Sequence, residues 1–578
     1  MATVSPTTST TSTPASVSSG QSSSSVDRSG LTEDDVVDAK VQPYLDRIDS
    51  INNTITGNQA KVSAYQDMQK LLTNLENAVD ALRSPIDSST DVFDMRAATM
   101  TSSDPSITAS NVMSVSVDPN TDEATHTVSV EQLASAQRIS SNGTASRASA
   151  LGYSGTFSIG ESGKTAANVT ITADMSLNDI ATAINDSKGT TGVTASVVAV
   201  SSTSYKLVLT GADTNQTINM STSSGTVLSD LGVTQADGAT AANILQNAQP
   251  AKLTVDGVQI ERDTNQVDDA IDGVSMNLTA TTVTGDPSNP TSDAAITLTV
   301  GNDTSSISNA IETFTESYNA WREFVGSNQA TNSDGTASSS ATLFGDSTLR
   351  QASNDVDSAL TSLVGTTALG AIGITMNSDN ELDIDTDTLN TALTTNFASV
   401  QTLFAYTANT SNNDLRLTAH GSSTYSGTFT VNAVTDASGN LTGATATDSN
   451  GNTTALTVSG DSIKGPAGSA YAGLQFSFTG DQSESITVNA NQGIADQLYQ
   501  VTEQAADPNV GSIQTLIQSI QTQDSTLQSN AADLQTEANN YSTYLLDYYG
   551  RLESSISEAN QTATLLQQML QLDSANNN

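Results

Sequence analysis

Apolar residues at the two ends of the chain recur in alternating steps of three and four positions. One such stripe covers residues 31–83, and a longer one covers residues 511–571. This spacing gives a helix one narrow apolar seam, which has to pack against another helix. A continuous helix over 511–571 would be roughly 90 Å long, too long for one globular domain to surround. The pattern therefore predicts that the N- and C-terminal helices return to one stalk.

The seams supply the candidate interface residues, which we expect to contact the other terminal helix or a partner protein. These positions are Ile48, Ile51, Ile55, Val62, Tyr65, Leu72, Leu527, Leu534, Tyr541, Leu545, Tyr548 and Leu552. Asn58, Gln69 and Glu76 interrupt the first stripe, and Asp524 interrupts the second. The alternative is a pair of amphipathic helices buried separately in ordinary cores. The narrowness and length of the seams favour the stalk.

In the middle of the chain, apolar and polar residues alternate with the two-residue period of β-strands rather than the period of helices. Examples are residues 92–99, 107–117 and 125–131. Ser176, with Asp179 three residues on, predicts a capped helix inside a strand–helix–strand unit. The expected fold class is multidomain α+β, with β-rich domains inserted between long, coiled-coil-like terminal helices that form a stalk.

This pattern divides the chain into eight segments. They are a disordered Ser/Thr-rich leader at 1–30, an N-terminal helical leg at 31–90, a β-rich segment at 91–150, an inserted β-rich domain at 151–250, a second β-rich segment at 251–300, a mixed helical stalk domain at 301–410, a second inserted β domain at 411–490 and a C-terminal coiled-coil leg at 491–578.

Composition narrows the function classes. The chain has 62 acidic and 19 basic residues, a formal charge of -43, which argues against nucleic acid as a partner. It has no cysteine, so disulfides and thiolate metal sites are excluded. No apolar run reaches the ~20 residues of a membrane helix, so we expect no membrane insertion. The first residues have no Lys or Arg before Arg28 and no apolar core, so export is expected without a cleaved signal peptide.

Two segments partly match the sequence motifs of ligand-binding loops, one for phosphate and one for calcium. "SIGESGKT" at 158–165 ends like a phosphate-binding loop, but an alternating, strand-like stretch follows it where that loop needs a helix. We therefore expect a hairpin turn there. Asp383, Asp385 and Asp387 alternate as in a calcium loop, but the sixth position is not glycine and the twelfth is not glutamate. A helix N-cap at Asp385 or Asp387 is the simpler expectation.

No constellation of residues indicates catalysis, so the expected protein is not an enzyme. His126 and His420 are the only histidines, and neither has a neighbouring set of metal ligands. We expect both to be lone surface histidines, and we expect no cofactor or metal. Trp321, the one tryptophan, lies on an amphipathic stretch and is expected to anchor a core.

Several motifs, taken in their order along the chain, resemble the flagellar filament cap family, also called hook-associated protein 2. The likeness covers about residues 28–571, although Thr32 replaces a usual Asp and the leader before Arg28 departs from the pattern. The motifs are "SGLTEDDVV" at 29–37, "VSVEQLASAQ" at 128–137, "SLNDIATAIN" at 176–185, the segment 255–278, the run "IGIT…LDIDTDTLNTAL…F" and the ending "YLLDYYGRLESSISEANQTATLLQQML".

The resemblance implies an extracellular protein at the tip of the bacterial flagellum. It implies a homo-oligomeric ring of about four to six subunits whose β domains form a plate and whose helical ends form legs. Flagellin would be a partner, together with the hook–filament junction proteins and an export chaperone at the C-terminal helix. The cap would promote flagellin polymerisation and prevent its loss to the medium.

Other functions stay open at this point. The chain could be another axial component, namely flagellin or a hook–filament junction protein. It could also be a surface adhesin whose β lobes bind host glycans, a role that is compatible with capping. An enzyme is the third alternative.

Overall fold

The computed structural model describes residues 32–83, 91–283, 294–361, 369–421 and 425–576, so the leader expected at 1–30 lies outside the described residues. The chain divides into two compact units. The first unit comprises Met1–Glu76, Ser317–Ala359 and Gln500–Asn578, and the second comprises Asn77–Glu316 and Leu360–Tyr499. The fold class is α+β, with long terminal helices and a β-rich middle, as predicted.

The first unit is helical. Its long elements are α1 (Glu33–Asp80) and α12 (Ser512–Asn576), and it also takes parts of α6 (Thr304–Gln329), α7 (Ser347–Thr361) and α11 (Ile494–Ala506). Acidic residues fill the first turn of α1, where they complement the positive end of the helix dipole. Trp321 on α6 is fully buried, which confirms it as a core anchor. The α6 residue Arg322 lies 3.1 Å from the carboxylate of Asp357 on α7.

In the second unit, the first lobe is a β-sandwich. One sheet has the order β1-β15-β3-β11-β12 and the other has the order β13-β14-β2. The bounds are β1 Arg96–Ser102, β2 Met113–Val117, β3 Ala124–Gln132, β11 Ala251–Val255, β12 Val258–Arg262, β13 Gln266–Ile271, β14 Val274–Leu278 and β15 Ile296–Asn302. The strand expected over 107–117 is wrong in its first half, because α2 (Ala109–Val112) buries Ala109 and Val112 in the core.

The second lobe is inserted between β3 and β11, which still pair with each other in the first lobe. Its sheets have the orders β10-β4-β8-β7 and β6-β5-β9. The bounds are β4 Arg138–Ser140, β5 Gly155–Glu161, β6 Ala167–Ile171, α3 Leu177–Asn185, α4 Lys188–Thr191, β7 Val193–Ser201, β8 Ser204–Gly211, β9 Ile218–Gly225, α5 Val227–Asp230 and β10 Ile244–Gln246. Leu177, Ile180 and Ile184 of α3 enter its core.

The predicted cap of α3 is confirmed. The Ser176 side chain accepts from the backbone N–H of Asp179, and the Asp179 carboxylate accepts from the Ser176 backbone N–H at 2.9 Å. The expected hairpin at 158–165 is also present. It joins β5 to β6, whose antiparallel register pairs Ile159 with Ala167. A strand therefore follows this loop where a phosphate-binding loop needs a helix.

The third lobe lies between α10 (Phe397–Phe404) and α11. Its eight strands have the order β18-β25-β20-β21-β22-β23-β24-β19. The bounds are β18 Thr407–Thr410, β19 Leu415–Ala419, β20 Gly427–Thr435, β21 Leu441–Asp448, β22 Thr453–Ser459, β23 Ser462–Lys464, β24 Gln475–Phe478 and β25 Glu484–Asn491. The two ends of the insertion meet, because a Cβ added at Gly493 would lie 2.1 Å from the carbonyl oxygen of Phe404.

A segment made of a β-hairpin and a helix precedes the third lobe in sequence. Strands β16 (Ile374–Met376) and β17 (Leu382–Ile384) form the hairpin, and α9 (Thr386–Thr395) follows. Asp385 caps α9 by accepting from the backbone N–H of Thr388, which confirms the N-cap prediction.

His420 corrects one expectation, because it is 1% exposed rather than a surface residue. Its Nε2 lies 2.8 Å from the carbonyl oxygen of Arg83, and its Nδ1 lies 3.5 Å from the carboxylate of Asp496. The ring also stacks on Tyr406. Burial raises the pKa of Asp496, while His420, Gln492 and Arg83 oppose that rise. Through these contacts, Tyr406 and His420 of the third lobe are joined to Arg83, which follows α1, and to Asp496 on α11.

Candidate functional site

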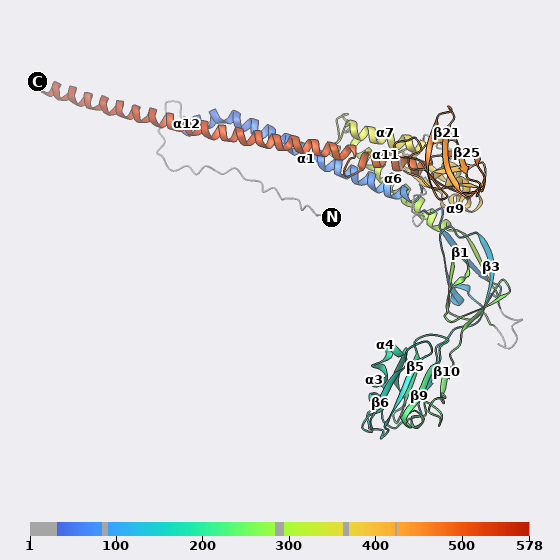
Figure 1. Cartoon of the computed structure of the whole chain (residues 1–578). Helices are drawn as coiled ribbons and strands as arrows, with labels where there is room; N and C mark the ends of the chain where they lie inside the picture. The colour runs from blue at the N-terminus through green and yellow to red at the C-terminus, as the bar shows by residue number, and fades with distance from the viewer. Residues whose placement is uncertain (1–31, 84–90, 284–293, 362–368, 422–424, 577–578) are drawn as a thin grey trace. The chain divides into compact units, whose positions relative to one another are not determined.

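The terminal helices α1 and α12 pack against each other in the first unit (Figure 1). Their shared core contains Val37 and Val41 from α1, and Ala538 and Leu545 from α12. The pairing is antiparallel, since low residue numbers on α1 meet high residue numbers on α12. The rings of Tyr44 and Tyr541, for instance, lie 6.0 Å apart between centroids. The stalk predicted from the two seams is therefore present within one chain.

The polar residues that interrupt the seams find partners across them. Asn58 Nδ2 donates to Asp524 Oδ1 at 2.6 Å, and Asp524 is 7% exposed. Gln69 Nε2 donates to the carbonyl oxygen of Ala506 at the end of α11, at 3.0 Å. A buried polar group without such a partner is costly, so these bonds favour one register of the helices over its neighbours.

The structure places the twelve candidate interface residues in three groups. Five are buried, namely Ile48, Ile55, Tyr65, Leu72 and Leu545. Five are half-buried, namely Ile51, Val62, Leu527, Leu534 and Tyr541. Two are exposed, namely Tyr548 at 52% and Leu552 at 44%. Most of the predicted positions thus serve contacts inside the chain, and the exposed pair marks the point where α12 loses its cover.

Tyr65 joins α1 to the start of α7. Its hydroxyl donates to Asp346 Oδ2 at 2.6 Å, while Asp346 Oδ1 accepts from the backbone N–H groups of Thr348 and Leu349. Burial, together with the bond to Asp346, raises the pKa of Tyr65. One carboxylate therefore caps α7 and also holds the seam, a role that the sequence pattern did not reveal.

Beyond the start of α1, α12 continues with its apolar residues uncovered. Every residue from 554 to 572 is exposed, including the stripe residues Ile556, Leu566 and Leu570. The last ~20 residues of α12 correspond to roughly 30 Å of helix. A large apolar face left in water is a recognised mark of an interaction surface.

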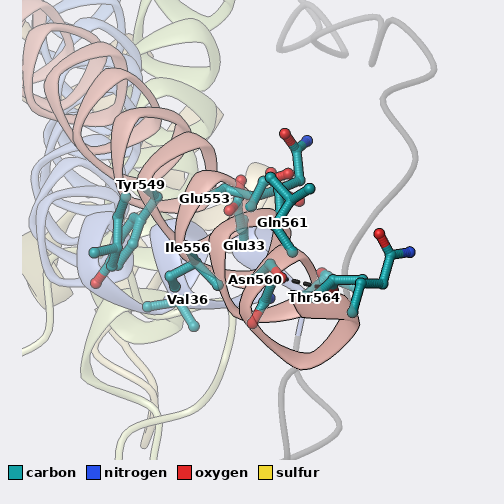
Figure 2. A pocket seen from close by; sticks show the side chains of 13 residues that line it. Glu33, Val36, Tyr549, Glu553, Ile556, Asn560, Gln561 and Thr564 are labelled. Atoms are coloured by element: carbon teal, nitrogen blue, oxygen red, sulfur yellow. Dashed lines mark hydrogen bonds between the residues drawn. The ribbon is translucent and has the colours of Figure 1, made fainter. Parts of the chain in front are cut away.

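A groove of about 860 Å³ lies where α1 begins against α12 (Figure 2). Val36 from α1 and Leu552 and Ile556 from α12 line its apolar part. Glu33 and Glu553 line its acidic part, and burial together with the Glu553 carboxylate raises the pKa of Glu33. The groove shares Leu552 and Ile556 with the exposed apolar stripe of α12. We call Val36, Leu552, Ile556, Leu566 and Leu570 together the distal seam.

The distal seam contains residues that the candidate list left out. Ile556, Leu566 and Leu570 belong to the same stripe, but they follow a step of four residues where the regular spacing breaks. Val36 precedes the first residue counted in the N-terminal stripe. The apolar spacing could have found the three α12 residues, whereas Val36 lies five positions before Val41 and is off the three–four spacing. Exposure could not be read from the spacing.

Neither a metal centre nor a membrane span is found among the residues that the structure describes. They contain no group of three or more His, Cys, Asp or Glu residues suited to a metal ion. No described helix is both long enough and apolar enough to cross a bilayer. Asp383, Asp385 and Asp387 are exposed, and Asp385 has the capping role described above.

Comparison with protein families gives three matches. The model described as flagellar hook-associated protein 2 C-terminus matches residues 248–561, and its N-terminal counterpart matches residues 29–137. The flagellin hook IN motif matches residues 156–213, which lie in the second lobe and contain the segment 176–185.

Individual proteins give similar matches. The chain is 29% identical over 367 residues to the B-type flagellar hook-associated protein 2 of Pseudomonas aeruginosa, covering 60% of this chain and 72% of that protein. It is 28% identical over 376 residues to the flagellar hook-associated protein 2 of Escherichia coli K12, covering 63% and 76%. A crystal structure of the D1-D2-D3 domains of the Escherichia coli flagellar cap protein FliD aligns with a TM-score of 0.43 at 28% identity, over 59% of this chain and 89% of that one.

The order of the matches repeats the order of the motifs along the sequence, with the two terminal models flanking the internal motif. The C-terminal model alone spans more than half of the chain and ends within the distal part of α12. The chain belongs to the flagellar hook-associated protein 2 family.

Proposed function

We propose that this protein caps the growing tip of the bacterial flagellar filament. In this role it promotes insertion of exported flagellin and prevents flagellin loss to the medium. Family membership supports the proposal. The proposed role is structural, and the cap is a homo-oligomeric ring of about four to six subunits.

The observation that carries the proposal is the distal seam. It is apolar and continuous with a helical stalk, and its α12 residues Leu552, Ile556, Leu566 and Leu570 are exposed. Amphipathic helices bind such stripes through their own residues spaced by three and four. The proposed occupant at the filament tip is a terminal helix of flagellin or of a hook–filament junction protein.

A chaperone contact and an export route follow for the protein before assembly. An exposed stripe of leucines would drive non-specific association in the cell, so an export chaperone on the C-terminal helix would keep it covered. The protein would then reach the extracellular tip through the flagellar export route, without a cleaved signal peptide.

The decisive experiment adds one charge to α12 on two different faces. Ile556→Asp changes the distal seam, whereas the matched variant Ser554→Asp adds the same charge in the same turn, on the opposite side of the helix. Each is expressed in cells that lack the native gene, and free flagellin in the medium is measured by immunoblot. We expect Ile556→Asp to release several-fold more flagellin than Ser554→Asp, at equal export.

Equal release by both variants would remove the distal seam as the docking surface. If cells without the gene assembled filaments as well as wild-type cells, the capping function itself would be wrong.

A further inference from the structure

A cleft of about 770 Å³ opens at one end of the first lobe. Three connections surround it: residues 118–122 between β2 and β3, the turn at 256–257 between β11 and β12, and the turn at 272–273 between β13 and β14. They come from both sheets of the sandwich, so the cleft leads toward the core between the sheets.

The floor of the cleft is apolar. Val255, Val274 and Val300 belong to the buried core of the lobe and also line the cleft. At its mouth, Val258 is 63% exposed on the β11–β12 hairpin. An occupant therefore gains mainly by covering the exposed Val258 side chain, because the valines of the floor are already buried.

The rim of the cleft is acidic. Asp118, Asp122, Asp256 and Asp272 line it, and His126 is the only lining residue that could carry a positive charge. The His126 side chain already pairs with Asp256, whose Oδ2 lies 2.7 Å from His126 Nδ1. The histidine and the backbone N–H of Thr127 hold the pKa of Asp256 below its usual range. Within the described part of the chain, no ion pair involves the other three carboxylates.

The rim is also held in place by its own hydrogen bonds. The backbone N–H of Asp118 donates to the carbonyl oxygen of Gly273 at 2.8 Å, and Thr121 Oγ1 donates to the carbonyl oxygen of Asp118 at 2.7 Å. Gly273 has a φ of 69°, and a Cβ there would lie 2.2 Å from Thr121 Oγ1. Arg96 Nε donates to the carbonyl oxygen of Thr121 at 3.1 Å, so this guanidinium braces the loop.

We propose that this cleft is a binding site for a peptide segment that carries a lysine or arginine beside aliphatic residues. The apolar floor takes the aliphatic side chains, and the unneutralised carboxylates of the rim take the cation. Because opposite charges across a partly enclosed surface set both orientation and specificity, such a segment is preferred over neutral and acidic ones. All residues that line this site belong to the second unit, so the proposal does not rest on the capping proposal.

The test uses the full chain with 13C-labelled valine methyl groups, observed by NMR. Acetyl-Val-Lys-Val-amide is titrated in, and the same peptide with norleucine in place of lysine is the neutral control. We expect the methyl signals of Val274 and Val300 to shift with the lysine peptide, and to shift at least several-fold less at equal concentrations of the norleucine peptide. Asp118→Asn combined with Asp272→Asn should weaken binding of the lysine peptide about tenfold. Asp268→Asn, an exposed carboxylate on β13 outside the cleft, should leave binding unchanged.

Three results would overturn the proposal. They are equal binding of the two peptides, shifts confined to methyl groups outside the cleft, and an affinity that the double variant does not change. Calcium chloride is titrated separately. If calcium shifts the same methyl signals at micromolar concentration and displaces the peptide, the cleft is an inorganic cation site instead.

Discussion

At the scale of single residues, the stalk depends on a polar contact inside an apolar seam. Asn58 and Asp524 are 466 positions apart in sequence, yet they form one hydrogen bond where both stripes are interrupted. Such a pair adds little net stability, but a helix that slid by one turn would leave both groups unpaired. Its value is therefore to select the register in which α1 and α12 meet.

Removing only one partner should expose this cost. We expect Asp524→Leu to lower the free energy of unfolding of the paired helices by about 1–3 kcal/mol, because the Asn58 amide loses its acceptor. The double variant Asn58→Leu with Asp524→Leu should recover most of that loss, since two apolar residues then face each other. Urea unfolding followed at 222 nm, with hydrogen exchange of α1, measures both. A double variant no more stable than the single one would contradict the argument.

The capping box of α3 predicts a pH dependence. Hydrogen bonds from Ser176 hold the pKa of Asp179 below its usual range. A carboxyl with a lowered folded pKa stabilises above its unfolded pKa of about 3.9, and this stabilisation is lost as pH falls through the folded value. We expect Asp179→Asn to increase hydrogen exchange in 177–185 at pH 7, and the difference from wild type to vanish well below pH 3.9 once exchange rates are corrected for pH. A difference that persists unchanged at low pH would assign the effect to packing.

At the scale of elements, α12 serves two purposes along its length. Its first part is covered by α1 and by other helices of the first unit, whereas residues 554–572 are exposed to solvent. Leu545 lies in the covered part, whereas Ile556 lies in the bare part. Substitutions only three turns apart should therefore affect different properties, namely stability in one case and partner binding in the other.

Adjacent leucines give a matched comparison of this division. Leu545 is 8% exposed, and Leu546 is 44% exposed. We expect Leu545→Asp to lower the free energy of unfolding of the helical unit by about 2–5 kcal/mol, because a charge replaces a packed side chain. Leu546→Asp should change it by less than about 0.5 kcal/mol. Urea unfolding at 222 nm separates the two, and equal losses would mean that the side chain of Leu545 is not the packed one.

The elements show what the sequence could predict and what it could not. Helical ends, the cap at Ser176 and the turn after β5 depend on neighbouring residues, so local spacing and capping chemistry predicted them correctly. The burial of His420 depends on Arg83 and Asp496, which are distant in sequence, and a lone histidine gives no sign of them. The partner of Asn58 was hidden for the same reason. α2 was missed because four residues are too short for a helical period to appear.

At the scale of the whole molecule, charge and connectivity dominate. The formal charge of -43 is carried by a chain in which only 14% of residues are charged, so each copy repels another over distances set by salt. The proposed ring has to form against this repulsion. Contacts made by apolar and polar surfaces must therefore supply the association free energy.

Screening should consequently favour assembly. The Debye length falls from ~30 Å at 0.01 M salt to about 8 Å at 0.15 M. We expect the oligomer fraction in analytical ultracentrifugation to rise over that range at fixed protein concentration. Dissociation on adding salt would show instead that attractive ionic contacts hold the subunits together.

The closeness of the two ends of the third lobe has an evolutionary consequence. Because Phe404 and Gly493 touch, the intervening segment begins and ends at one point, and β3 and β11 likewise pair across the second lobe. Recombination can exchange, lengthen or delete such a segment without moving the flanking elements apart or changing the heptad phase of either terminal helix. Homologous genes should therefore diverge fastest, in length as well as in sequence, between these paired boundaries. Two antigenically unrelated strains would then carry interchangeable terminal helices, while their inserted lobes share no epitope.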